Sequence, residues 1–199
     1  MERLPIVERR AQLIRAALAV ASRDGIEAAT VRAIAAEAGV SLGVVHYCFE
    51  DKNELLREVG DAIAAQGVDR VELARLARPD AHRAIGAAIT TRWEAMRAHR
   101  GVQLLGFELT TQGLRNPDLR GVATAQRDRN LRAAREMLDE AAAVANIRWT
   151  VPIQLLARFS VAAMDGVVLA WLVDDDEAAR AALSSLTTHL TTHTTPSRK

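Results

Sequence analysis

Residues 31–48 read VRAIAAEAGVSLGVVHYC, and this stretch decides the fold around which the rest of the chain is arranged. The small residue Ala35 precedes Gly39 by four positions, and the apolar Val40 and Val45 follow that glycine. In a helix-turn-helix, a small residue lets the two helices approach, and glycine supplies the left-handed backbone of the turn. The stretch therefore predicts two short helices that cross steeply, with the two valines packed in the angle between them.

The second of these helices leaves Leu42, Val44, His46 and Tyr47 on faces that the interior does not need. In a DNA-reading helix-turn-helix this helix lies in the major groove. His46 and Tyr47 are then expected to hydrogen-bond base edges or phosphates. Leu42 and Val44 are expected to contact thymine methyl groups.

Three helix starts, near Thr30, Ser41 and Lys52, are expected to offer backbone N–H groups to phosphates. Lys52 at the start of a helix opposes the helix dipole, and a bound anion would explain its position. The same short pattern also occurs in helical proteins that never bind DNA. Residues 1–57 contain eight basic and eight acidic residues, so the sum of charges shows no basic footprint.

The composition predicts an all-α protein. Of 199 residues, 38 are Ala and 24 are Arg, both strong helix formers, whereas aromatic residues make up only 4%. Apolar residues make up 49% and charged residues 26%, as in ordinary globular chains. The lone Cys48 cannot form an internal disulfide, which favours a reducing cytosol.

The net charge of +1 argues neither for nor against an anionic partner. The N-terminus shows no apolar segment typical of a signal peptide. The most apolar stretch, residues 161–173, is interrupted by Asp165 and is shorter than the 18 residues that a membrane span needs. These features predict a soluble, cytoplasmic protein with no membrane partner.

Proline and glycine divide the chain into about nine helices with no convincing strand. A first helix is expected from Pro5 to Asp24, and a long one from Lys52 to residue 77, which Gly60 and Gly67 weaken. The remaining helices are expected over 81–99, 101–114, about 118–145, 152–173 and a last segment before 190.

These segments resemble the TetR family of transcriptional regulators. The resemblance is specific over about residues 7–60 and rests on the runs TVRAIA at 30–35, GVSLGVVHYCF at 39–49 and DKNELL at 51–56. It implies a homodimer with a three-helix DNA-binding domain at 7–67 and a ligand-binding and dimerisation domain at 68–190. The polar residues 191–199 are expected to form a disordered tail.

The resemblance also places nine residues at positions that commonly touch DNA in this family. They are Thr30, Arg32, Ser41, Leu42, Gly43, Val44, His46, Tyr47 and Lys52. The family often has Tyr where His46 stands and a polar or basic residue where Leu42 stands. The base preference at these two positions is therefore not given by the resemblance.

The last two predicted helices carry stripes that would suit a dimer interface. Small and apolar residues recur at helical spacing in both, and two copies would form an intermolecular four-helix bundle. The alternative is that the stripes belong to the core of one chain. The residues are Leu156, Ser160, Ala163, Val167, Ala170, Leu183, Leu186 and Leu190.

The middle helices are expected to hold a small-molecule effector, because apolar residues there surround a few polar ones. The set is Trp93, Met96, Phe107, Glu108, Gln112, Phe159, Met164 and Asp165. Each aromatic side chain can equally be core. Asp165 is the most suggestive, since an acid inside an apolar run needs a partner. The pattern suggests a largely apolar or cationic effector.

Together these features predict a ligand-responsive transcriptional repressor that binds a pseudo-palindromic operator as a homodimer and is released by a small molecule. The alternative is a dimeric helical module that binds a ligand or a protein without reading DNA. The zero charge sum of residues 1–57, which contain most of the predicted DNA-binding domain (the head), slightly favours that alternative. No nucleophile–base motif or phosphate loop predicts an enzyme, and neither a cofactor nor a metal site is expected, since His189 and His193 have no third ligand.

Overall fold

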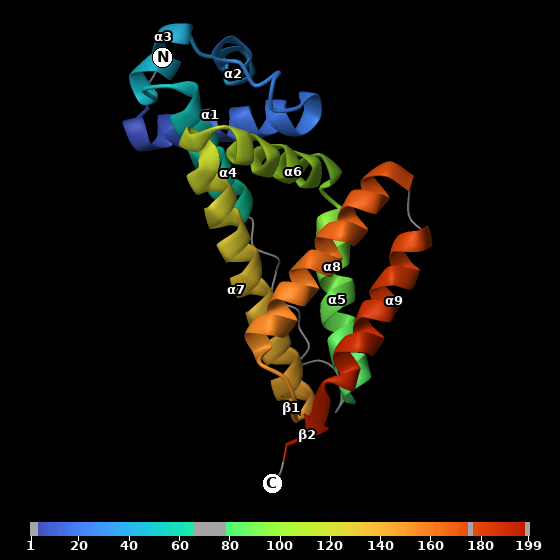
Figure 1. The fold of residues 1–199 in the computed structure, drawn as a ribbon. Helices are drawn as coiled ribbons and strands as arrows, with labels where there is room; N and C mark the ends of the chain where they lie inside the picture. The colour runs from blue at the N-terminus through green and yellow to red at the C-terminus, as the bar shows by residue number, and fades with distance from the viewer. Residues whose placement is uncertain (1–3, 66–78, 175–176, 198–199) are drawn as a thin grey trace. The chain divides into compact units, whose positions relative to one another are not determined.

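The computed structural model describes residues 4–65, 79–174 and 177–197 and confirms the all-α class. In these residues nine α-helices are joined by one 3-10 turn and two short strands (Figure 1). The elements are α1 (Ile6–Asp24), α2 (Val31–Glu37), α3 (Leu42–Cys48), α4 (Lys52–Ala65), α5 (Ala81–Arg97), α6 (Arg100–Arg115), η2 (Pro117–Leu119), α7 (Arg120–Ala145), β1 (Ile147–Trp149), α8 (Ile153–Asp174), α9 (Glu177–Thr192) and β2 (Thr194–Pro196).

The chain forms two compact units. Unit 1 contains residues 1–67 and 101–127, and unit 2 contains residues 68–100 and 128–199. The chain passes from one unit to the other three times, whereas the sequence predicts a single boundary after residue 67. Most of α6 and the first eight residues of α7 belong with the N-terminal helices, which sequence reasoning missed. The predicted end of the long helix, residues 66–77, lies outside the described residues.

The helix-turn-helix of unit 1 forms as the sequence predicts. The Thr30 hydroxyl oxygen accepts the Ala33 N–H at 3.1 Å and caps α2. Gly39 has φ +65°, the left-handed conformation that the turn requires. Ala35 and Val45 are buried where α2 and α3 meet. Side chains from α1 complete this core, so α3 is held by its inner face alone.

The same core extends onto α6 and α7. Leu105 and Leu109 of α6 and Val122 of α7 are buried in one apolar cluster with Leu13 of α1 and Val59 of α4. Each such buried side chain contributes about 1.5–3 kcal/mol, so α6 is an integral part of unit 1.

Two glycines are required by close approach between helices. A Cβ at Gly101 would lie 2.1 Å from the Ser22 carbonyl oxygen, so α6 begins against the backbone of α1. A Cβ at Gly60 would lie 2.6 Å from Val122 Cγ1. Gly60 therefore acts as a packing residue between α4 and α7, a role beyond the helix weakening expected from the sequence.

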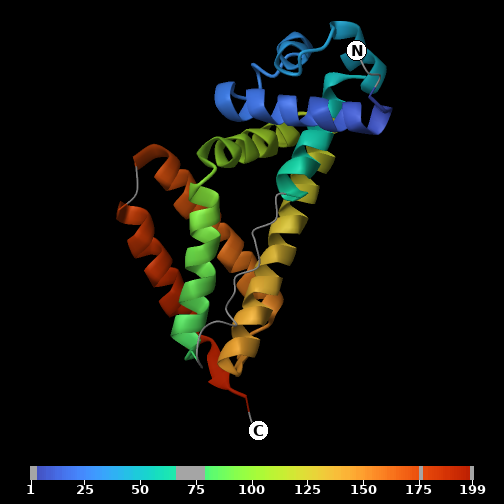
Figure 2. The ribbon, with the colours of Figure 1, turned by 180° about the vertical axis from the view of Figure 1, so that it is seen from behind.

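Unit 2 is built around α5, α8 and α9. In both views α9 lies beside α5 and α8 (Figures 1 and 2), and α9 packs against each of them. Asp80 caps α5 by accepting the Arg83 N–H at 2.8 Å. Trp93 of α5 meets Trp171 of α8 edge to face, with ring centroids 5.3 Å apart.

The C-terminal segment differs from the expected disordered tail. Helix α9 continues to Thr192, and β2 then pairs antiparallel with β1, with Arg148 opposite Thr195. The Thr150 N–H donates to the His193 carbonyl, and the Ser197 N–H donates to Asn146. The prediction of no strand is also wrong here, because backbone pairing gives polar residues an ordered place that their side chains do not signal.

Helix α8 is long and apolar enough to cross a membrane, by length and composition alone. Its mean hydropathy over an 18-residue window is 1.7. Within the described residues it is the one helix that passes this test of length and composition. Its inner face, including Leu156, Met164 and Trp171, is buried against the rest of the chain. A core helix of a water-soluble protein passes the same test, so this result is weak evidence for a membrane.

Candidate nucleic-acid interface

The outer face of α3 presents most of the side chains predicted to contact DNA. Tyr47 is 77% exposed and Leu42 is 42% exposed, although both are large and apolar or aromatic. His46 and Gly43 are exposed as well, and Val44 is half-buried. Val45 and Cys48 are buried on the opposite side of the helix and hold it in place. The exposed face is therefore fixed in position although it contributes nothing to the core.

The residues at the helix starts are also accessible. Thr30, Arg32 and Ser41 are exposed, and the Ser41 side chain makes no capping hydrogen bond. Arg32 forms no hydrogen bond or ion pair with the described part of the chain, so its guanidinium is available to a phosphate.

Lys52 has a partner inside the chain. Its Nζ donates to the Ile26 carbonyl oxygen at 3.4 Å. The dipole of α4 is already complemented, because Asp51 accepts the Glu54 N–H at 2.7 Å and Glu54 adds negative charge in the first turn. An anion is therefore not needed to explain Lys52, and its contact with DNA stays a prediction.

Several acidic groups of the head are engaged by basic ones. Arg10 donates to Glu54 at 2.8 Å and to Glu58 at 2.9 Å, and its guanidinium lies 4.3 Å from the centre of the Phe49 ring. These carboxylates raise the pKa of Arg10. Arg23 bridges Glu37 and its neighbour Asp24. The zero charge sum of the head thus reflects internal pairs rather than a uniformly neutral surface.

The residues predicted to bind an effector separate into the two units. Phe107, Glu108 and Gln112 lie on α6 in unit 1, and the other five lie in unit 2. Glu108 accepts the Ile26 N–H at 2.8 Å, and Gln112 donates to Glu27 at 2.7 Å. In this structure both polar side chains hold the segment between α1 and α2.

In unit 2 the predicted residues differ in burial. Trp93 is only 2% exposed, and its indole N–H has no hydrogen-bond partner among the described residues. Met164 is buried, while Met96 and Asp165 are half-buried. Phe159 instead faces outward, where its ring lies 4.6 Å from that of His189.

Sequence reasoning missed Arg92, which lies next to Trp93 on α5. Burial lowers the pKa of the Arg92 guanidinium, and the charge of Asp165 on α8 opposes that shift. The acid inside the apolar run therefore faces a basic group from another helix, as the cost of burying an isolated charge requires. The signal in the sequence that could have indicated Arg92 was Asp165, an acid inside an apolar run that needed a partner.

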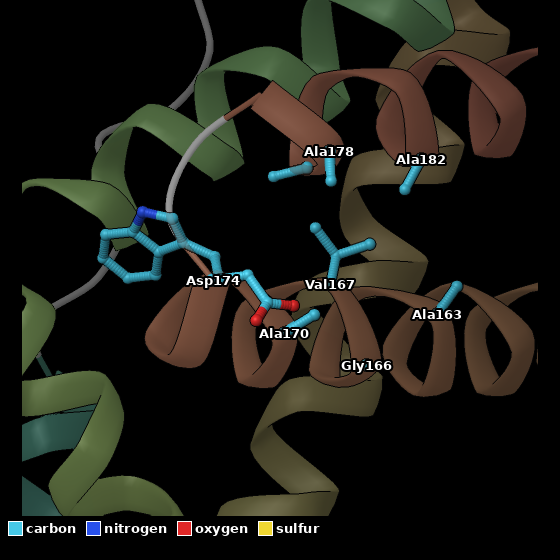
Figure 3. A pocket seen from close by; sticks show the side chains of 9 residues that line it. Ala163, Gly166, Val167, Ala170, Asp174, Ala178 and Ala182 are labelled. Atoms are coloured by element: carbon cyan, nitrogen blue, oxygen red, sulfur yellow. The ribbon is translucent and has the colours of Figure 1, made fainter.

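The residues predicted for the dimer interface are mostly buried inside one chain. Ala170 is exposed and Ala163 is half-buried, whereas the six others belong to the intrachain core: Leu156, Ser160, Val167, Leu183, Leu186 and Leu190. A shallow groove of about 370 Å³ runs between α8 and α9 and is lined mainly by alanines, with Gly166 and Asp174 (Figure 3). No cluster of three or more metal-ligating side chains occurs in the described residues.

Comparisons with known proteins define the class of this chain. The family model described as bacterial regulatory proteins, tetR family, matches residues 13–59, and the tetracyclin repressor-like C-terminal domain matches residues 77–192. The chain belongs to the TetR family. It is a transcriptional regulator, and the family and its homologues are not enzymes.

The chain is similar over most of its length to particular regulators. It is 30% identical over 176 residues to the nicotine-responsive transcriptional repressor HdnoR of Paenarthrobacter nicotinovorans, covering 88% of this chain and 89% of the relative. A transcriptional regulator of Rhodococcus sp. Rha1 shares the fold with a TM-score of 0.71, 22% identity and coverage of 93% and 97%. The regulator FadR of Bacillus subtilis, solved with stearoyl-CoA, has a TM-score of 0.69, 21% identity and coverage of 92% and 98%.

Proposed function

We propose that this protein is a cytoplasmic, ligand-responsive repressor that binds a pseudo-palindromic operator as a homodimer. The observation that carries the proposal is the exposed face of α3, where Leu42, His46 and Tyr47 project while Val45 and Cys48 hold the helix from inside. The similar protein HdnoR is a repressor. In a dimer, two copies of α3 would enter major grooves about 34–36 Å apart.

We assign the dimer interface to an exposed apolar stripe on α8. Its members recur at alternating spacings of four and three, and two of them, Leu155 and Val173, are 60% and 77% exposed. The stripe consists of Leu155, Phe159, Ala162, Gly166, Leu169 and Val173. It lies beside the α8–α9 groove, whose alanine lining admits a close helix (Figure 3). A second copy would bury both, giving a four-helix bundle of α8 and α9 from each chain.

The proposed effector is a small aromatic molecule with a hydrogen-bond acceptor. A buried indole N–H without a partner costs about 1–3 kcal/mol, so Trp93 favours a ligand that supplies an acceptor. The ring of Trp171, which meets Trp93 edge to face, would add an aromatic contact. HdnoR responds to nicotine, which carries an aromatic nitrogen acceptor and a basic amine.

We propose that α6 couples effector binding to the head. Only Ala98 and His99 separate the end of α5, which carries Trp93, from the start of α6. Helix α6 in turn holds the segment between α1 and α2 through Glu108. If the effector binds more tightly when α6 is displaced, it lowers the affinity of the protein for DNA. The size of this decrease is set by the difference between the effector's affinities for the two arrangements of α6.

The first test is selection of random duplex DNA on the purified protein at low and moderate salt. Recovery of a pseudo-palindromic site whose affinity falls as salt rises supports the repressor. A folded dimer that recovers no sequence at either salt would refute it and favour a helical binding module that does not read DNA. Light scattering after Leu155→Glu tests the dimer, with Leu114→Glu on α6 as control, since Leu114 is exposed to a similar extent.

The effector proposal is tested with nicotine itself. Nicotine should release the selected duplex from the wild-type protein, and Trp93→Phe should weaken that release without changing DNA affinity in its absence. Unchanged release from the variant would exclude the indole N–H as a ligand contact.

A further inference from the structure

We infer that α3 recognises its half-site through the methyl group of thymine, with Leu42 as the reading side chain and Gly43 as the point of closest approach. This inference rests on the proposed function, since it assumes that α3 lies in the major groove. It extends that function by naming the base chemistry that the helix reads.

The first observation concerns the hydrogen-bonding side chains that α3 carries. Its seven residues, Leu-Gly-Val-Val-His-Tyr-Cys, include no Arg, Lys, Asn or Gln. These are the side chains that form two hydrogen bonds with guanine or adenine in the major groove. Helix α3 therefore cannot form two hydrogen bonds with one base through such a side chain. His46 and Tyr47 can each add single hydrogen bonds, but they lack the forked geometry that two bonds to one base require.

The second observation is the exposure of Leu42. In a reading helix, the N-terminal residues are those that reach base edges. Of the first three residues of α3, Val44 packs partly against the core of unit 1 and Gly43 carries no side chain, whereas Leu42 is 42% exposed although burial would stabilise it. An apolar side chain at a base edge gains free energy from one group in particular, the C5 methyl of thymine.

The third observation is that nothing in the described part of the chain requires glycine at position 43. A Cβ there would meet only the Ser41 hydroxyl at 4.0 Å, and the backbone is ordinary right-handed helix. Glycine inside a helix is unfavourable compared with alanine. Gly39 differs, since its φ of +65° explains it locally. An external surface that comes close to α3, as the wall of a groove does, accounts for Gly43.

Together these observations describe a low, apolar ridge at the start of α3, formed by Leu42 and Gly43, with polar groups beside it. Arg32 on α2 and Ser41 before α3 are exposed and suited to phosphates, so they would set the position of the ridge without reading sequence. The ridge then discriminates thymine from cytosine, which lacks the methyl group. The selected half-site should therefore contain a thymine under Leu42.

The test uses the duplex recovered by the selection, with each thymine of one half-site replaced in turn by deoxyuridine. This replacement removes the methyl group and keeps base pairing. Wild-type affinity should fall about fourfold at one position, as expected for the loss of one buried CH₂-sized group. Leu42→Ala should abolish that sensitivity at its own thymine. Leu114→Ala, an equivalent truncation on α6, should retain it.

A second variant tests the close approach. Gly43→Ala should raise or maintain the melting temperature and weaken DNA binding at least tenfold. Gly121→Ala, also a helical glycine with open space around it, should match its stability without the loss of binding. Full DNA affinity of Gly43→Ala would overturn the inference.

Equal affinity for the thymine and deoxyuridine duplexes would likewise overturn it, as would a penalty that Leu42→Ala leaves unchanged. Either result leaves the repressor proposal intact, because a selected duplex would already exist. If selection recovers no sequence, the proposed function fails and this inference fails with it.

Discussion

The Glu108 carboxylate accepts the backbone N–H of Ile26 at 2.8 Å, across 82 residues of sequence. The other side of the same residue is also held, because Lys52 donates to the Ile26 carbonyl oxygen at 3.4 Å. The preceding Gly25 has φ +88°, and a Cβ there would lie 3.5 Å from Glu108 Oε1. Helices α4 and α6 thus meet on one backbone segment, immediately before the helix-turn-helix.

Removing this carboxylate should loosen the segment between α1 and α2. Glu108→Ala leaves the N–H of the buried Ile26 without its charged acceptor, which should cost about 1–3 kcal/mol in the free energy of unfolding. Urea unfolding measures the loss, and hydrogen exchange should accelerate at the Ile26 amide. Thr111→Ala is the control, since its hydroxyl bonds only carbonyls of its own helix. Unchanged exchange at Ile26 would contradict the assigned contact.

Gly101→Ala should strongly destabilise unit 1. Its Cβ would lie 2.1 Å from the Ser22 carbonyl oxygen, so α6 must move away from α1. Overpacking of this kind costs about 1–3 kcal/mol or more. Thermal unfolding should show a clear drop in melting temperature, whereas Gly121→Ala has open space and should show none. A neutral Gly101→Ala would mean that α6 has room to shift freely.

The ion pairs around Arg10 should make stability depend on acid pH. Hydrogen bonds from the Glu50 N–H and from Arg10 hold the pKa of Glu54 below its ordinary value. The stability that they contribute is present above the ordinary glutamate pKa and is lost as pH falls through the lowered one. The stability advantage of the wild type over Glu54→Gln should therefore shrink as the pH falls below the ordinary glutamate pKa of about 4.3. A constant difference below that pH would contradict the shift.

Lys52→Ala should weaken binding to all duplexes by a similar factor, because a phosphate contact carries no sequence information. The slope of log affinity against log salt should become shallower by about 1. Arg57→Ala, a charge removal on the same helix, should leave the slope unchanged. His46→Ala should alter the preferred sequence instead. An unaltered salt slope in Lys52→Ala would show that its ammonium serves only the bond to Ile26.

The head was largely predictable because its determinants are local. The Thr30 cap, the left-handed Gly39 and the burial of Ala35 and Val45 follow from residue spacing within one short stretch. The exposure of Leu42, His46 and Tyr47 follows from the same periodicity, whereas Val44, predicted to be exposed with them, packs partly against the core. Such features depend on backbone conformation and nearest turns, which a single sequence encodes directly.

Polar residues of α6 and α8 needed the tertiary structure. Glu108 and Gln112 looked like ligand-binding side chains from their apolar surroundings, yet they bond Ile26 and Glu27 of unit 1. Asp165 required a partner that no local pattern identified, and the charge of Arg92 on another helix complements it. Periodicity reports which face of a helix is apolar, but it does not report which distant segment meets an isolated polar group.

The sequence by itself determined the helix-turn-helix, the family and the all-α class, since capping, glycine conformation and amphipathic spacing act over a few residues. Tertiary structure decided which apolar stripe of α8 is core and which remains exposed, because both stripes satisfy the same helical period. It also decided the pairing of β1 with β2, in which long-range backbone hydrogen bonds order a segment of polar side chains.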